Sequence, residues 1–197
     1  MPAAVTHPVA ADLTGTVVAV HRSATHTFSK QPEPSVQLVA GLGVEGDAHQ
    51  GARVRHRSRV AADPDQPNLR QVHLVAAELI DEVVAAGHDL VPGQLGENVT
   101  TSGLDLIGLP VGTLLRIGDD AVLALTGLRN PCPQIRGVGD GVLKMMFTDA
   151  GDYGGEPGEK LGRTGAMAVV AAGGTIRPGD TIAVRFPPGP HVPMRRV

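Results

Sequence analysis

The sequence has very few aromatic residues and only one cysteine. It contains no Trp, one Tyr and three Phe among 197 residues, so it offers no set of aromatic rings on which bases or sugars would stack. A single cysteine cannot form an internal disulfide, which favours a reducing compartment and leaves one free thiol to explain. The core must therefore be built from Val, Leu, Ile and Ala.

The chain also lacks an excess of charge and any long apolar run. Its net charge is -3, with 19% charged residues, which is typical of a globular protein without bulk attraction to nucleic acid or membranes. Apolar runs such as 166–174 are far shorter than the roughly 20 residues that span a bilayer. The first residues lack the basic and apolar regions of a signal peptide. We therefore expect a cytoplasmic protein with no nucleic-acid or membrane partner.

Short apolar runs separated by turn residues indicate a mostly β fold. Their length and their Val, Ile and Leu content favour strands. The seven runs lie at 16–21, 35–40, 71–76, 113–118, 122–127, 166–172 and 181–186. Asp119 and Asp120, between the fourth and fifth runs, predict a tight hairpin. Because so many short strands accompany so few helices, a closed or nearly closed barrel is favoured over a parallel α/β sheet.

Helical periodicity is limited to one or two segments. Apolar residues between Ala76 and Val84 fall on one face of a helix, and Gly87 supplies its C-terminal stop. A second, weaker helix is expected over about 142–147. No linker divides the chain, and its length suits a single core.

The two ends of the chain, 1–13 and 187–197, are rich in Pro and small residues. Such composition is typical of segments that do not form regular structure. They are predicted to be terminal arms that lie over the surface.

The single cysteine lies in the segment "LRNPCPQI", residues 128–135. Pro131 and Pro133 fix φ on both sides of Cys132 and prevent regular strand pairing, so the thiol is predicted to lie in a rigid loop. Arg129, three residues earlier, is placed to stabilise a thiolate, the form that binds metals or attacks electrophiles. A metal ligand suits this loop better than the alternative, a small buried apolar residue.

Two further polar segments are candidates for chemistry. In "GLGVEGDAHQG" at 41–51, Asp47 and His49 are spaced to supply two metal ligands, or Asp47 caps its own turn. In "RVRHRSR" at 53–59, four alternating arginines would share one side of an extended segment and form an anion site. A solvated edge or a mobile loop is favoured for this second segment, because the residues that follow it are typical of a loop.

A third segment, "LGENVTT" at 95–101, contains Glu97 and Asn98. These two side chains either hydrogen-bond a ligand or serve only the turn. Because glycines and asparagine allow close approach of the backbone to a ligand, we expect 43–51, 95–100 and 128–132 to converge on one cleft. No nucleophile elbow, phosphate-binding loop or dinucleotide-binding glycine motif is present.

Taken together and in this order, several motifs resemble the MOSC domain family, which is related to the C-terminal part of molybdenum-cofactor sulfurases. They are "FSK" at 28–30, "GVEGDAHQG" at 43–51, "RQVHL" at 70–74, the segment 93–118, "LRNPCPQI" at 128–135 and "GGTIRPGDTIAV" at 173–184. The resemblance covers a domain at 14–186. It implies a MOSC-type β-barrel, similar to the barrel of pyruvate kinase, with one or two short helices.

The resemblance also implies a role centred on Cys132. Related members bind a pterin-based molybdenum cofactor with that cysteine as metal ligand, and reduce N-hydroxylated compounds such as hydroxylaminopurines. Others are thought to pass sulfur as a persulfide. Thiolate is a soft ligand suited to a thiophilic metal. The phosphate of the cofactor needs cations, for which Arg129 and Lys30 are the first candidates and Arg70 the next.

The sequence therefore predicts a protein that binds molybdenum cofactor and reduces N-hydroxylated bases or related small molecules, with electrons from a separate redox protein. The alternative is a sulfur carrier or delivery module that uses a Cys132 persulfide without bound metal. Such a carrier is expected to work without pyridoxal phosphate, because the sequence contains no cysteine desulfurase domain. A separate protein would donate the sulfur. A third interpretation is a binding module that has lost its chemistry. The expected site comprises Cys132 as catalytic residue and metal ligand, with Arg129, Lys30, Arg70, Asp47, His49, Glu97 and Asn98 around the cofactor.

Overall fold

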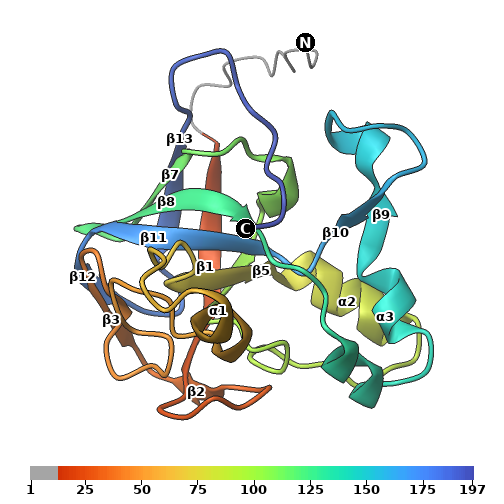
Figure 1. Ribbon diagram of the computed structural model, residues 1–197, viewed down its shortest axis with the longest axis horizontal. Coiled ribbons are helices and arrows are strands. Elements are labelled where there is room, and N and C mark those ends of the chain that lie inside the picture. The colour runs from red at the N-terminus through yellow and green to blue at the C-terminus, as the bar shows by residue number, and fades with distance from the viewer. Residues whose placement is uncertain (1–12) are drawn as a thin grey trace.

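A closed β-barrel forms the centre of the computed structural model, which describes residues 13–197 apart from the side chains of 57–59 (Figure 1). Its seven strands are β1 (Thr14–Arg22), β5 (Val72–Ala76), β6 (Val99–Ser102), β7 (Leu114–Ile117), β8 (Ala121–Leu128), β11 (Ala166–Ala172) and β13 (Thr181–Arg185). They are ordered β13-β7-β8-β11-β5-β6-β1, and pairing of β1 with β13 closes the ring. Neighbouring strands are antiparallel except β5 and β6, which are parallel.

The barrel interior is filled by aliphatic side chains. Buried and more exposed residues alternate along β7 and along most of β8, as expected when every second side chain of a strand points inward. Leu115, Ile117, Leu123 and Ile182 are fully buried there. Because burying one such side chain is worth about 1.5–3 kcal/mol, this interior is the main source of stability.

Smaller elements surround the barrel. Strand β2 (Gln31–Glu33) pairs with β1. Strands β12 (Gly174–Ile176), β3 (Val36–Val39) and β4 (Gly43–Val44) form a three-stranded sheet, and β9 (Phe147–Asp149) pairs with β10 (Lys160–Gly162). The β9–β10 pair stands beside the barrel, at the right of Figure 1.

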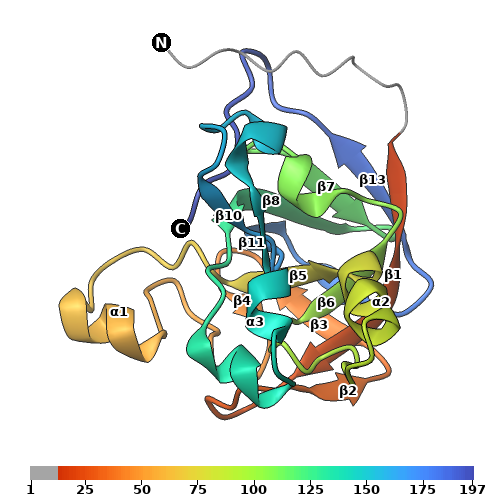
Figure 2. The ribbon, with the colours of Figure 1, turned by 90° about the vertical axis from the view of Figure 1, so that its right-hand side faces the viewer.

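The helices are short and lie outside the barrel. They are α1 (Arg57–Ala62), α2 (Ala77–Ala85) and α3 (Val142–Met145), with 3-10 helices η1 (Leu106–Gly108), η2 (Pro133–Gly137) and η3 (Ala150–Tyr153). Figure 2 shows α1 projecting away from the barrel, whereas α2 and α3 lie together against it. Apolar residues of α2, η2 and α3 form a second buried cluster, which holds η2 in place beside the barrel.

The strand and helix predictions are confirmed for the larger elements. All seven predicted strand runs form strands, the hairpin joins β7 to β8, and the two predicted helices are α2 and α3. The interpretation of 53–59 as one extended segment is wrong, because the chain becomes helical at Arg57. None of the helices within residues 13–197 has the length and apolar character that crossing a bilayer requires.

The C-terminal segment is anchored to the barrel near its end. Met194 is only 1% exposed and packs into the barrel core. The backbone N–H of Val111 donates to Val192 O at 2.9 Å, and that of Leu128 donates to Arg195 O at 2.8 Å. Most of the predicted arm at 187–197 is exposed, but Met194 and these backbone hydrogen bonds fix it to the barrel. The other predicted arm, 1–13, lies outside the described residues except for Leu13.

Candidate functional site

A cavity of about 330 Å³ lies beside the first residues of β5, β6 and β11 and the end of β8. Among the predicted site residues, those that line it are Lys30, His49, Arg70, Asn98 and Arg129. His49, Asn98 and Arg129 each come from one of the three segments that were expected to converge. Lys30 and Arg70 are the two other residues predicted to hold the phosphate of the cofactor. The predicted convergence on one cleft is thus confirmed.

Asp47 organises one wall of this cavity, although it does not line the cavity itself. Its Oδ2 accepts hydrogen bonds from Lys30 Nζ at 2.6 Å, Asn98 Nδ2 at 3.0 Å and the backbone N–H of Ser23 at 3.3 Å. Its Oδ1 accepts from the backbone N–H of His49 at 2.9 Å and faces His49 Nδ1 at 3.1 Å. One fully buried carboxylate therefore fixes three side chains that face the cavity.

The Lys30–Asp47 pair is a buried ion pair. The two side chains are 4% and 0% exposed. Burial alone would raise the pKa of Asp47, but hydrogen bonds from His49 and the charge and hydrogen bond of Lys30 lower it below its ordinary value. Burial lowers the pKa of Lys30, and the charge of Asp47 opposes this shift. Neither partner is stable in the charged form without the other.

Asn98 and His73 connect this wall to the barrel strands. Asn98 Oδ1 accepts from the backbone N–H of His73 at 3.2 Å, while Asn98 Nδ2 also donates to His21 O at 3.2 Å. His73 Nε2 lies 2.7 Å from Thr164 O, so this nitrogen carries a proton and donates it. Burial, and then the charge of Arg129, lower the pKa of His73 well below its ordinary value. His73 is therefore a neutral, fixed part of the cavity wall.

Glu97 supports the loop that ends at Asn98 rather than facing the cavity. Its carboxylate accepts from the backbone N–H of Gly93 at 2.5 Å and of Leu95 at 3.1 Å, and from Thr100 Oγ1 at 3.2 Å. The side chain is fully buried, and burial raises its pKa against the effect of these hydrogen bonds. The structure thus places Glu97 behind the site, with its oxygens already engaged.

Cys132 lies at the margin of the cavity. It has extended backbone angles immediately before η2, as predicted for a cysteine held between two prolines in a loop. Its Sγ lies 3.8 Å from Arg129 Nη2 and 3.8 Å from Gln134 Oε1, and both of these neighbours line the cavity. Cys132 is partly buried, because it also packs against the cluster formed by α2, η2 and α3.

Arg129 contacts the thiol of Cys132, lines the cavity and has one guanidinium nitrogen without a hydrogen-bond partner among the described residues. Its Nη1 is buried and has no hydrogen-bond partner among the described residues. Buried polar atoms in proteins are normally paired, so an unpaired guanidinium nitrogen at a cavity indicates a missing partner. An acceptor such as a phosphate or carboxylate oxygen fits this position.

Arg70 brings a further guanidinium to the cavity and connects it to the C-terminal segment. Its Nη1 donates to Val197 O at 3.0 Å. The backbone N–H of Val197 donates in turn to Leu128 O at 3.3 Å, at the end of β8. The position of Arg70 therefore depends on the segment that the sequence had predicted to be a surface arm.

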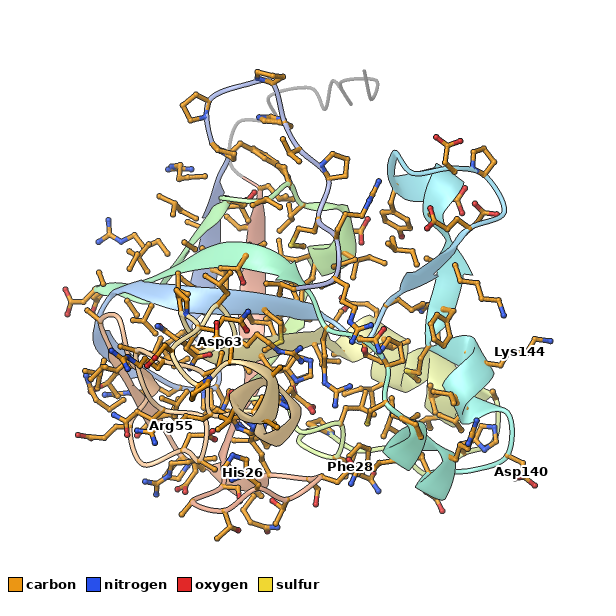
Figure 3. All side chains as sticks on the ribbon, viewed as in Figure 1. His26, Phe28, Arg55, Asp63, Asp140 and Lys144 are labelled. Atoms are coloured by element: carbon orange, nitrogen blue, oxygen red, sulfur yellow. The ribbon has the colours of Figure 1, made fainter. Side chains whose placement is uncertain are left out.

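Four histidines line the cavity, and three of them lie close together although only His49 among the three was predicted. His26 and His56 line it together with His49, and the ring centroids lie 5.0 Å apart for His26–His49 and 5.3 Å for His49–His56. His26 and Phe28 are on the segment that joins β1 to β2, below α1 in the view of Figure 3. No sequence spacing links His26 or His56 to His49, because the contacts depend on how three loops fold together.

The charges of the cavity indicate the kind of ligand that it fits. Among the described residues that line it, three are Lys or Arg and none is Asp or Glu. Within the described part of the chain, no three His, Cys, Asp or Glu side chains are grouped as metal ligands. The donor set thus suits a molecule with an anionic group for the cations and a soft centre for the single thiol.

A comparison with protein-family models decides the family. The model of the MOSC domain matches residues 45–183. The chain belongs to the MOSC domain family. This family is associated with molybdenum-cofactor binding, and the MOSC match includes the segments that carry Asp47, Asn98 and Cys132.

Solved structures show the same MOSC fold. The YuaD protein from Bacillus subtilis is 22% identical, with a TM-score of 0.72 over 90% of this chain and 99% of that one. YiiM from Geobacillus stearothermophilus is 16% identical, with a TM-score of 0.57 over 87% and 75% of the two chains. YiiM from Escherichia coli is 17% identical, with a TM-score of 0.54 over 88% and 71%. No curated protein sequence matches this chain.

Proposed function

We propose that this MOSC protein binds a pterin-type molybdenum cofactor in the cavity between Lys30, Arg129 and Cys132 and reduces N-hydroxylated bases or related small molecules. A separate redox protein supplies the electrons. The observation that carries the proposal is the pairing of a thiol, 3.8 Å from Arg129 Nη2, with a buried guanidinium nitrogen of the same arginine that lacks a partner.

The residues present fit such a cofactor. Arg129 and Arg70 would hold its phosphate through charge-assisted hydrogen bonds, and Lys30 would add a positive charge deep in the wall. Asn98 keeps its place through three hydrogen bonds to the rest of the wall, and so presents a fixed surface to the ligand. Cys132 would supply the protein's sulfur ligand to the metal. When bound, the cofactor supplies oxygen-atom and electron chemistry that no side chain of the chain provides.

The chain's own residues prepare the thiol for this role. Arg129 Nη2 lies 3.8 Å from Cys132 Sγ and so holds the thiol beside the cavity. Pro131 and the helical turn of η2, packed against α2, limit the movement of the loop. A fixed sulfur ligand loses less conformational entropy on binding than a mobile one.

Replacing Arg129 tests the proposal through cofactor retention. Arg129→Gln is expected to lower the affinity for the cofactor by about 10-fold to 100-fold, because a hydrogen bond to a charged group is worth roughly 1.5–3 kcal/mol. The protein would be produced in a molybdenum-replete host, and molybdenum and pterin would be measured per chain by elemental analysis and by fluorescence of the oxidised pterin.

Arg136→Gln is the matched control, because Arg136 is an exposed arginine of η2 that does not line the cavity. It is expected to bind as much cofactor as the parent. The proposal fails if the parent takes up no cofactor when cofactor is supplied, or if Arg129→Gln binds it as tightly as the parent.

A further inference from the structure

The reaction proposed above consumes protons, and the cavity contains a group placed to deliver them. Reduction of an N-hydroxylated amine follows R–NH–OH + 2e⁻ + 2H⁺ → R–NH₂ + H₂O, with both electrons supplied by the separate redox protein. The N–O bond breaks, one proton goes to the departing oxygen and the other to nitrogen. Hydroxide is a poor leaving group, so a positioned proton donor accelerates this step.

We infer that His49 is the proton donor of this site, that Asp47 positions it, and that His26 and His56 relay protons to it from solvent. The inference rests on the proposed reductase function, since without an N–O bond to break the donor has no substrate. It assigns to His49 a catalytic role distinct from holding the cofactor.

The contact between Asp47 and His49 orients the imidazole. The carboxylate is fully buried and stays ionised, and its Oδ1 lies 3.1 Å from His49 Nδ1. An anionic acceptor at this position requires Nδ1 to carry a proton. Nε2 is therefore the ring nitrogen left to exchange a proton with a substrate in the cavity that His49 lines, an arrangement common to orienting carboxylates and catalytic histidines.

The imidazole of His49 is available for proton transfer. Its side chain is 22% exposed and lines the cavity, and its Nε2 makes no hydrogen bond within the described residues. Two other basic groups of the wall, His73 and Lys30, are already engaged. His73 Nε2 donates to Thr164 O, and Lys30 Nζ lies 2.6 Å from the same carboxylate.

The other two imidazoles connect His49 with bulk water. His26 is exposed, and its Nε2 is held 2.9 Å from Arg55 O. His26 and Arg55 lie on the same side of the molecule in Figure 3, at the lower left. The His26 and His56 rings lie 5.0 and 5.3 Å from the His49 ring, measured between centroids. At these separations a bridging water molecule would carry the proton from ring to ring.

The first test reads the orientation of His49 without any cofactor. Long-range ¹H–¹⁵N spectra of the protein labelled with ¹⁵N-histidine report which ring nitrogen carries the proton. The signal of His49 is assigned by its disappearance in His49→Gln. The inference predicts the Nδ1-protonated tautomer, and a neutral His49 protonated at Nε2 would overturn it.

The second test measures turnover of the cofactor-loaded protein with 6-N-hydroxylaminopurine and reduced methyl viologen as the electron source. His49→Gln is expected to lower kcat by about 10²-fold to 10⁴-fold, the usual contribution of a general acid, with cofactor content within about twofold of the parent. In His49→Ala, added imidazole is expected to restore part of the rate, which a merely structural histidine would not allow. His26→Gln slows turnover by a smaller factor.

His191→Gln is the control, because His191 stacks on Phe186 and its Nε2 donates to Pro187 O at 3.0 Å, away from this cavity. It is expected to leave turnover unchanged. Full activity of His49→Gln, or loss of cofactor from it, would overturn the inference while leaving the proposed function in place. Absence of turnover in the cofactor-loaded parent would instead reject the proposed function, and this inference with it.

Discussion

Cys132→Ser is expected to abolish bound molybdenum and N-hydroxyl reduction while the melting temperature stays within about 2 °C of the parent. Serine is a hard and poorly ionised ligand, so it cannot replace a thiolate at a soft metal. The thiol contributes little to stability, because it is only partly buried and its two polar contacts are 3.8 Å long. Metal content, turnover and thermal unfolding would be measured on the two proteins after supplying cofactor to both.

The same comparison separates the proposed function from its alternatives. If the parent binds no molybdenum but gains the mass of one sulfur atom at Cys132 when incubated with a cysteine desulfurase and cysteine, the sulfur-carrier alternative is supported. If Cys132→Ser loses its fold and the parent takes up no cofactor, Cys132 is a core residue. Retained N-hydroxyl reduction in Cys132→Ser contradicts the proposed role of the thiol.

Asp47→Ala is expected to destabilise the protein by about 3–5 kcal/mol, because it leaves the ammonium of Lys30 buried without its counter-charge. The carboxylate also accepts hydrogen bonds from Ser23, His49 and Asn98, and these donors lose their partner too. For a chain of this size the loss corresponds to a melting temperature about 10 °C lower. Denaturant unfolding followed by circular dichroism measures it.

A second substitution shows how much of this loss belongs to the ion pair. Adding Lys30→Met to Asp47→Ala is expected to recover about half of the lost stability, since no buried charge then remains unpaired. The exposed pair of Arg22 and Glu33, 3.0 Å apart, is the control, and Glu33→Ala is expected to cost less than about 1 kcal/mol. Strictly additive effects of the Lys30 and Asp47 substitutions would contradict a coupled pair.

The barrel strands could be predicted because each buries enough apolar residues to leave a pattern in the sequence. The tight turn at Asp119 and Asp120 also predicted how β7 and β8 pair with each other. Strands β2, β4, β9, β10 and β12 were missed, because two or three residues are too few to show a period. The anchoring of the C-terminal segment was not predicted, because one buried residue, Met194, and a few backbone hydrogen bonds leave no pattern in the composition.

The loops that form the site could be predicted from the sequence, but the hydrogen bonds and ion pairs between them could not. The order of motifs indicated which loops meet, and the cavity brings together His49, Asn98 and Arg129. The ion pair between Lys30 and Asp47 joins loops whose approach only the folded chain determines. The role of Glu97 was also not predictable, because sequence does not reveal whether a carboxylate near a turn binds a ligand or the backbone of its own loop.

Molybdenum bound in the cavity beside Cys132 would be located by X-ray diffraction from crystals of the cofactor-loaded protein, measured at the molybdenum absorption edge. One anomalous peak per chain is expected, within bonding distance of Cys132 Sγ and inside the cavity that Arg129 and Lys30 line. A peak in the separate cavity between α2 and Tyr153, or no peak in crystals that contain the supplied cofactor, would contradict it.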